Sequence, residues 1–341
     1  MSAISEIALV ANEEAIDLSS ILKDLVAAGS ASHGLATSEL PIAAQAKVIA
    51  SVAAESLATG FVLWSHRMTT EYVERFGSEE LRSKFLTQLK EGGRLGSTAL
   101  ATALVDNSGA QELPITFTQT DSGYLINGHI PWASNLRPGT LVVFGAREEK
   151  GERRGLFATL VGSEGLLVKP AGELLGLNGT SSGSIRFENH QLHATQLLTH
   201  DCKGFFAAMR PRFLLLQSAF CLGLVKASLE SARAVPAPSF EVKISEFTAR
   251  LSQIESRFHE LEDSLAVFHE GGPKSGPLPF VALRLDLAVL AQEVTRVELA
   301  VVGGRGYFAA HPTSRRVRES LFLSVQAPTE GALRWELQQF S

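Results

Sequence analysis

The strongest constraint on the fold is a change of sequence pattern that occurs twice along the chain. Residues 1–95 are rich in Ala, Leu and Glu and read as helical. Residues 96–198 are instead rich in Gly, Thr and Ser, with short β-rich runs separated by turn residues. Helical patterns return from Gly204. This order predicts an α+β chain, with an all-α domain at 1–95, an antiparallel β-barrel or sandwich at 96–200 and a helical bundle at 201–341.

The helices predicted for the last section differ in how much of their surface is apolar. From Ile244 to Phe268, apolar residues recur at spacings of three and four, which is typical of a helix that packs on one face. The predicted helices at 204–233 and 280–302 are apolar nearly all round. Such helices must be buried inside a bundle or against a partner subunit. We therefore expect a homodimer or a homotetramer.

Composition and charge narrow the classes of function. The 341 residues include 31 basic and 36 acidic residues, with a net charge of −5, so nothing points to nucleic acid or an anionic membrane as a partner. Cys202 and Cys221 show no metal-binding or redox spacing, and we expect a cytoplasmic protein without a metal site. The first 30 residues lack the pattern of a signal peptide, and the apolar stretch at 213–225 is too short to span a bilayer.

The segment from Gly123 to Asn135 combines a turn signal with an aromatic residue and small polar residues. Asn127-Gly128 predicts a tight hairpin turn between two short apolar arms. The second arm ends in Trp132, with Ser134 two residues further on. A large flat aromatic surface beside hydroxyl and amide groups suits a planar heteroaromatic ring with polar edges. A tryptophan that simply packs in the core of a hairpin is the alternative.

This segment resembles the central β-domain signature of the acyl-CoA dehydrogenase family of flavoproteins, and the resemblance extends from about Tyr72 to the C-terminus. It implies the family's architecture, which is a helical domain, a β-barrel and a four-helix bundle. It also implies FAD as the cofactor, with Trp132 against the isoalloxazine ring and the hydroxyl of Ser134 at the redox-active edge of that ring.

Residues Thr102 to Gly109 fall where the family has a loop beside the flavin. The resemblance implies that the hydroxyls of Thr102 and Ser108 bond the pyrimidine edge and the phosphate side of the cofactor. Most other residues of the family's loop are changed here. A polar loop between two strands, without a cofactor, is an equally good interpretation.

Val302-Gly-Gly-Arg-Gly-Tyr307 resembles a family segment that lets the backbone approach the cofactor of a neighbouring subunit. This implies a cofactor-binding role for Gly303 and Gly304, since glycine has no Cβ to intervene. A glycine that ends the preceding helix is the alternative. The family's Arg-x-x-Phe-Gly element, which grips the pyrophosphate, has no counterpart in residues 231–240, and FMN therefore stays open beside FAD.

The family's catalytic glutamate removes the α-proton of an acyl thioester while a hydride leaves the β-carbon. The matching position is Ala327. Glu330 is either a displaced base or, as we favour, a first-turn carboxylate of the last helix. His66 either handles protons of an oxygenated flavin, as in monooxygenase branches of the family, or is a hydrogen-bonded core residue, which we favour. The cluster at 315–318 reads as surface or interface charge.

Three functions follow from these residues. The first is an acyl-CoA dehydrogenase-like, flavin-dependent oxidoreductase acting on CH–CH donors in an acyl-CoA or similar small molecule, with impaired or altered chemistry. The second is an FMN monooxygenase on the same fold, which needs no glutamate base. The third is a catalytically inactive family member that serves as a binding protein, and the loss of the base at Ala327 favours it.

Overall fold

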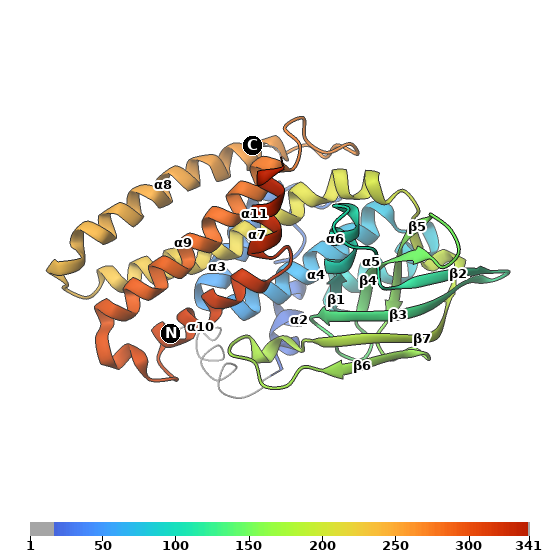
Figure 1. Ribbon diagram of the computed structural model, residues 1–341, viewed down its shortest axis with the longest axis horizontal. Coiled ribbons are helices and arrows are strands. Elements are labelled where there is room, and N and C mark those ends of the chain that lie inside the picture. The colour runs from blue at the N-terminus through green and yellow to red at the C-terminus, as the bar shows by residue number, and fades with distance from the viewer. Residues whose placement is uncertain (1–16, 340–341) are drawn as a thin grey trace.

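A computed structural model describes residues 17–339 of the chain (Figure 1). Helices come first along the chain, a β-sheet follows, and further helices complete it. In Figure 1 the sheet occupies one end of an elongated molecule and the long C-terminal helices the other. The first helices are α2 (Ser19–Ala27), α3 (Ile42–Glu55), α4 (Leu57–Phe76) and α5 (Glu79–Lys90).

The middle of the chain forms one sheet of eight strands. Its elements are β1 (Gly96–Ala99), α6 (Ala101–Asn107), β2 (Thr116–Thr120), β3 (Gly123–Ala133), β4 (Leu141–Glu148), β5 (Arg154–Leu160), β6 (Leu166–Pro170), the 3-10 turn η1 (Asn178–Thr180), β7 (Gly183–His193), the 3-10 turn η2 (Ala194–Gln196) and β8 (Leu197–Thr199). The path across the sheet is β6-β7-β3-β2-β4-β5-β8, and β1 pairs with β4.

The sheet is mixed and open, in place of the antiparallel barrel predicted from the sequence. β1 and β2 both run parallel to β4, with Ser97 opposite Val142 and Phe117 opposite Glu148. The two strands therefore follow β4 one after the other, and α6 is an excursion of the chain between them. Among the described residues, β6 and β8 each pair on one side only, so the sheet does not close.

Asn127 and Gly128 lie inside one long strand, so the predicted hairpin turn at this position is wrong. β3 runs through both residues, and the chain turns at 121–122 instead. The two residues form a bulge, because the pairing of β3 with β7 shifts in register between Ile126 and Gly128. Gly128 has φ +130°, and a Cβ there would lie 2.5 Å from the carbonyl oxygen of Pro114. A positive φ suits a bulge as well as a turn, and the partner strand decides between them.

The C-terminal part is helical. Its elements are α7 (Cys202–Arg233), the 3-10 turn η3 (Pro238–Phe240), α8 (Glu241–Ser264), α9 (Leu278–Val302), the 3-10 turn η4 (Gly303–Tyr307), α10 (Pro312–Val325) and α11 (Glu330–Gln338). α7 packs on α9 and also on α3. At Gly223 a Cβ would lie 2.1 Å from the carbonyl oxygen of Ala50, so the close approach to α3 requires glycine. A separate C-terminal four-helix bundle is therefore not confirmed.

The chain itself covers most of its two most apolar helices. α7 is long and apolar enough to cross a membrane by length and composition, but 83% of its most apolar window is buried, as in a core helix. The apolar stretch at 213–225, predicted to be too short for a bilayer, is only part of this helix. α9 is likewise buried along much of its length. Covering α7 and α9 therefore does not require a partner subunit.

A buried ion network joins α4 to α7, the two helices that supply the inner wall of the site described below. The carboxylate of Glu71 accepts hydrogen bonds from Arg67 and Arg75 over 2.8 Å each and from Arg212 of α7 over 2.7 Å. Burial raises the pKa of Glu71, but the three guanidinium groups outweigh it and lower the pKa to about 2. The network therefore holds one charged carboxylate among three cations.

Candidate functional site

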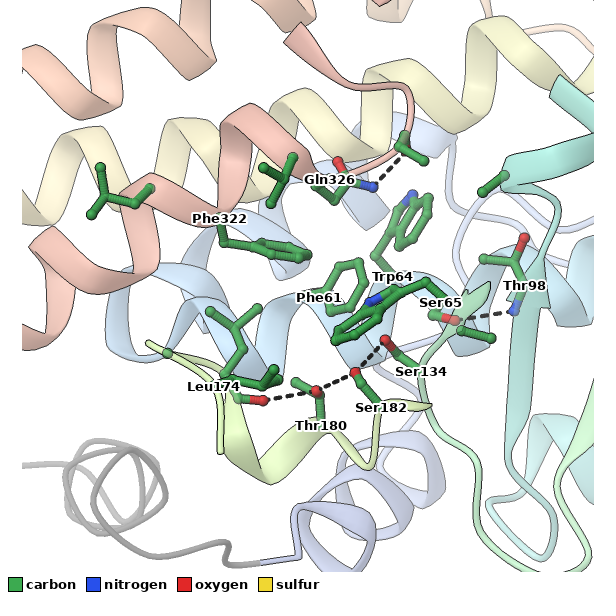
Figure 2. A pocket seen from close by; sticks show the side chains of 18 of the residues that line it. Phe61, Trp64, Ser65, Thr98, Ser134, Leu174, Thr180, Ser182, Phe322 and Gln326 are labelled. Atoms are coloured by element: carbon green, nitrogen blue, oxygen red, sulfur yellow. Dashed lines mark hydrogen bonds between the residues drawn. The ribbon is translucent and has the colours of Figure 1, made fainter. Parts of the chain in front are cut away.

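A pocket of about 600 Å³ lies between the sheet and helices α4, α7 and α10 (Figure 2). Its volume is within the range of small-molecule sites, roughly 300–1,000 Å³. The lining consists of Phe61, Trp64 and Ser65 of α4, Thr98 of β1, Leu100, Ala101 and Leu104, Trp132 to Ser134, Leu174 to Leu177, Thr180, Ser182, Phe213 of α7, and Arg318, Leu321, Phe322, Val325, Gln326 and Ala327. Six segments far apart in sequence thus meet at one cavity.

Trp132 and Ser134 both lie on the wall of this pocket, at the end of β3. Trp132 is 42% exposed, so much of its ring is free to contact a ligand, whereas Ser134 is 4% exposed. Ser97 of β1 holds this point of the backbone, because its hydroxyl donates a 2.6 Å hydrogen bond to the carbonyl oxygen of Ser134. A flat apolar face and a hydroxyl therefore line the same pocket.

A row of buried hydroxyls continues from Ser134 along the pocket wall (Figure 2). The Oγ of Ser134 lies 2.7 Å from that of Ser182, and the Oγ of Ser182 lies 2.7 Å from Oγ1 of Thr180. Thr180 in turn donates to the carbonyl oxygen of Leu177 over 2.8 Å. Sequence reasoning missed Thr180 and Ser182. The one signal for them was the cluster of small hydroxyl residues between Gly179 and Gly183.

Aromatic side chains form the inner end of the pocket. The rings of Phe61 and Trp64 stack with their centroids 5.6 Å apart. Phe322 meets Phe61 edge-on at 5.0 Å, and Phe213 meets Trp64 edge-on at 4.7 Å. Trp64 is held further by a 3.3 Å hydrogen bond from its Nε1 to the carbonyl oxygen of Phe213. This end of the pocket can therefore take an apolar group and exclude water from it.

Ala327 also lines the pocket. Its carbonyl oxygen accepts hydrogen bonds from Nε2 of Gln217 at 3.0 Å and from Nε2 of Gln326 at 2.7 Å. Arg284, which is fully buried, donates to Oε1 of Gln326 over 2.8 Å. Among the described residues that line the pocket, Arg318 is the one with an ionisable side chain, so the pocket has no carboxylate or imidazole to act as a base. Arg315 and Arg316 are buried, so the interpretation of residues 315–318 as surface charge is wrong, while an interface role stays a prediction.

Glu330 and His66 lie outside the pocket. Glu330 is the first residue of α11, and its Oε1 accepts a 2.9 Å hydrogen bond from Nε of Arg334, as expected of a first-turn carboxylate. His66 is buried in the core, where its Nδ1 accepts from the backbone N–H of Gly96 at 3.0 Å and its Nε2 lies 3.0 Å from the carbonyl oxygen of Leu89. These partners require a neutral ring protonated on Nε2. Burial lowers the pKa of His66 to about 4.

Thr102 and Ser108 line a second pocket of about 580 Å³ and not the pocket that contains Trp132. Both belong to helix α6 and its end, where a loop was predicted. The hydroxyl of Ser108 donates to the carbonyl oxygen of Val105 over 2.7 Å, while Oγ1 of Thr102 is buried without a partner among residues 17–339. Because Ala101, Leu104 and Ala327 line both pockets, the two cavities adjoin at these residues.

Two carboxylates that the sequence did not point to, those of Glu112 and Glu336, line the second pocket. Glu336 of α11 lines it, opposite Arg210 of α7. Nη1 of Arg210 donates to Oε1 of Glu336 over 2.6 Å, and Nη2 donates to Oε2. Both carboxylate oxygens are thus held by one guanidinium, an arrangement that favours an ion pair over a free base.

Gly303 and Gly304 lie in η4, away from both pockets. A Cβ at either position would meet nothing within 4 Å, so no contact within this chain requires glycine there. Gly303 does have φ +70° where α9 ends, as expected of a glycine that ends a helix. Beside them Tyr307 and Phe308 are 78% and 72% exposed. A cofactor-binding role of these glycines toward a neighbouring subunit stays a prediction.

Comparison with known proteins places these features in context. No family model matches the sequence. The chain is 24% identical over 289 residues to the acryloyl-CoA reductase (NADH) of Anaerotignum propionicum, a match that covers 80% of this chain and 73% of that protein. It is 26% identical over 271 residues to the mitochondrial isovaleryl-CoA dehydrogenase of Oryza sativa, covering 75% of this chain and 65% of that protein, a little under two thirds of it.

Solved structures show the same fold. A glutaryl-coenzyme A dehydrogenase in complex with glutaryl-CoA matches with a TM-score of 0.87 at 15% identity, over 98% of this chain and 89% of that one. The FAD complex of PigA matches with a TM-score of 0.81 at 18% identity, over 99% and 97% of the two chains. The chain therefore has the acyl-CoA dehydrogenase fold, and its sequence resembles acyl-CoA dehydrogenases over most of its length.

Proposed function

We propose that the protein is an FAD-dependent oxidoreductase of acyl-CoA dehydrogenase type that acts on an acyl thioester or a similar small molecule. The observation that carries this proposal is that Trp132, Ser134 and Ala327 line one pocket. The positions that match the family's ring-packing, edge-bonding and base residues therefore line one cavity, which supports the proposal. The relatives named above act on coenzyme A thioesters by their names, and PigA has been solved with FAD.

The residues of the pocket fit an isoalloxazine ring. Trp132 offers a half-exposed aromatic face, and the hydroxyl of Ser134 lies beside it at a polar edge. Across the pocket, Phe61 and Phe322 supply apolar surface for the substrate's acyl group. An apolar pocket with a few placed polar groups is the common form of a cofactor or ligand site. FMN stays the alternative to FAD, because residues 231–240 lack the pyrophosphate-gripping element.

The chain's own residues orient the ligands and keep water out, while a bound flavin supplies a two-electron acceptor for hydride. The ring of Trp132 packs on the cofactor, and the aromatic inner end holds the acyl group in a dry environment. No side chain of the pocket takes the α-proton, because Ala327 stands where the family has its glutamate. General-base catalysis contributes about 10²–10⁴-fold in rate, and we expect dehydrogenation to be slower by that order.

The missing base favours a second candidate function, a flavin monooxygenase on the same scaffold. Such a reaction begins from reduced flavin and oxygen and does not require a carboxylate at position 327. A catalytically inactive binding protein is the third candidate, and the helical replacement of the loop at Thr102 is consistent with it. All three candidate functions use the same fold, so only the behaviour of the cofactor distinguishes them.

Spectroscopy of the purified protein tests these functions. We expect a yellow protein that releases FAD on denaturation, identified by its mass, and whose visible absorbance is bleached slowly by an acyl-CoA without oxygen. Bleaching only by an external reductase, followed by oxygen consumption, would favour the monooxygenase. A colourless protein that takes up neither FAD nor FMN would favour the third candidate, a catalytically inactive binding protein.

We further propose that the protein is a homo-oligomer, and that η4 with its neighbouring residues forms part of the contact. Two exposed aromatic residues, Tyr307 and Phe308, stand there beside Gly303 and Gly304. Exposed aromatic side chains that lie together are typical of protein interfaces. α7 and α9 are largely covered within the chain, so this proposal rests on η4 and its neighbours alone.

A further inference from the structure

The hydroxyl row behind Ser134 leaves one arrangement of its protons. Three hydroxyls, those of Ser134, Ser182 and Thr180, make three short contacts, which end at the carbonyl oxygen of Leu177. A carbonyl oxygen only accepts, so Thr180 must donate to it. Each hydroxyl has one proton. Ser182 must then donate to Thr180, and Ser134 must donate to Ser182.

The proton of Ser134 is therefore already used, and its Oγ can only accept a further hydrogen bond. All three hydroxyls are buried, with 4% of Ser134, 9% of Ser182 and 2% of Thr180 exposed. In such surroundings a hydrogen bond is stronger than in water, and breaking one to turn a hydroxyl around is costly. The turn that holds Thr180 and Ser182 is itself constrained, since Leu177 and Ser181 at its two ends both have positive φ.

We propose that Thr180 and Ser182 are positioning residues that fix Ser134 as a hydrogen-bond acceptor toward the flavin, and so favour the reduced cofactor over the oxidised one. This inference rests on the proposed function, because it takes the ring edge to lie at Ser134. The redox-active nitrogen of an oxidised flavin carries a lone pair and accepts. After two electrons and a proton are taken up, the same nitrogen carries N–H and donates.

An acceptor at Ser134 has opposite consequences for these two states. The reduced ring gains a hydrogen bond to Oγ of Ser134, whereas the oxidised ring faces lone pairs and gains none. In the family resemblance the hydroxyl at this position simply bonds the ring edge. The row of hydroxyls makes Ser134 the acceptor of that bond, and this role depends on Thr180 and Ser182, which lie behind Ser134.

The midpoint potential of the bound flavin tests this directly, by anaerobic reductive titration against a reference dye. In Ser182→Ala the hydroxyl of Ser134 is released and can donate to the oxidised ring. We expect the affinity for oxidised flavin, relative to that for reduced flavin, to rise about tenfold. For a two-electron couple this corresponds to a fall of about 30 mV. Ser134→Ala removes the acceptor without creating a donor, so the reduced form loses its hydrogen bond and the potential should fall as well.

The double variant Ser134→Ala/Ser182→Ala separates a directed hydrogen bond from simple loss of packing. We expect it to have the potential of Ser134→Ala, because Ser182 acts only through Ser134. Thr180→Ser keeps the hydroxyl and should keep the wild-type potential. If Ser182→Ala does not fold, Thr180→Val serves in its place. This variant removes the acceptor to which Ser182 donates, so the midpoint potential of its flavin should fall too.

Two results would overturn this inference while leaving the flavin site in place. One is a wild-type potential in Ser182→Ala. The other is a potential in the double variant that lies as far below that of Ser134→Ala as the potential of Ser182→Ala lies below that of the wild type. If the wild-type protein does not bind flavin at all, the proposed function fails instead. The two failures are therefore distinguishable, and neither readout depends on turnover of a substrate.

Discussion

Nε2 of Gln217 on α7 donates a 3.0 Å hydrogen bond to the carbonyl oxygen of Ala327 in the turn between α10 and α11. The same oxygen accepts from Gln326 at 2.7 Å. A carbonyl with two donors is held firmly, which fixes the backbone of residue 327 against the core helix. A longer side chain at position 327 would therefore project from the wall of the pocket.

Replacement of Ala327 by Glu should restore a base to the pocket. We expect the flavin of Ala327→Glu to be reduced by an acyl-CoA about 10²–10⁴-fold faster than that of the wild type, since a positioned general base contributes that much. Stopped-flow absorbance without oxygen measures the rate. Ala327→Gln is the matched control, with the same shape and no base, and should stay slow. Wild-type reduction as fast as that of Ala327→Glu would show that another group already takes the proton.

Loss of the aromatic face at Trp132 should weaken flavin binding. Trp132→Ala is expected to cost about 1–3 kcal/mol of binding free energy, the contribution of a large ring that becomes buried against the cofactor. Fluorescence titration of apoprotein with FAD measures it. Val242→Ala is the control, because Val242 is also exposed, at 74%, but lines neither pocket. Equal losses in both variants would argue against the placement of the ring at Trp132.

His66 should make the protein less stable as the pH falls from 6.5 to 4. Burial lowers its pKa to about 4 in the folded state, so between these values the unfolded chain binds a proton there and the folded chain does not. Stability is therefore full above pH 6.5, falls as the pH drops, and levels off below the folded pKa, with a loss on the order of 3 kcal/mol.

Urea unfolding at pH 7 and pH 5 measures this loss, with His66→Gln as the variant that removes the titration. The free energy of unfolding should fall less between the two pH values in His66→Gln than in the wild type. The pKa of His190, lowered by its burial, contributes equally to both proteins and cancels in the difference. An identical fall in the two proteins would mean that His66 does not carry the effect.

The two carboxylates Glu71 and Glu330 should differ sharply in their contribution to stability. Glu71→Gln leaves three buried or nearly buried arginines without their shared carboxylate, and removal of one partner from a buried pair costs about 3–5 kcal/mol. Glu330→Gln removes a half-exposed pair with Arg334, worth about 0–1 kcal/mol. Urea unfolding measures both. Any flavin reduction by acyl-CoA that disappears in Glu330→Gln would instead make Glu330 the base.

Light scattering at micromolar concentration should give the mass of a dimer or a tetramer. Phe308→Asp should lower that mass, because it places a charge among the exposed aromatic residues beside η4. Val242→Asp is the matched control, since Val242 of α8 is also exposed, at 74%, but lies on another helix. A monomeric mass for the wild type would end the proposal of self-association.

Much of the candidate site follows from residue identity at matched positions. Trp132 and Ser134 were assigned from a motif, Ala327 was assigned from its matching position where the family's glutamate is lost, and all three line one pocket. Thr102 and Ser108 were assigned from spacing alone, where the motif is largely lost, and they lie in a second pocket. The local backbone at Thr102 is a helix in place of the predicted loop, and a cofactor-binding role of Thr102 and Ser108 stays a prediction.

By itself the sequence determined the order of helical and β-rich segments, the glycine at the bulge in β3, the apolar stripe of α8 and the absence of the family's base at position 327. These are properties of single residues and of local periodicity. Only the tertiary structure decided that Asn127-Gly128 is a bulge and that the hydroxyls of Thr180 and Ser182 line up behind Ser134. Those facts depend on which distant segment packs alongside, and local propensity carries no information about the partner.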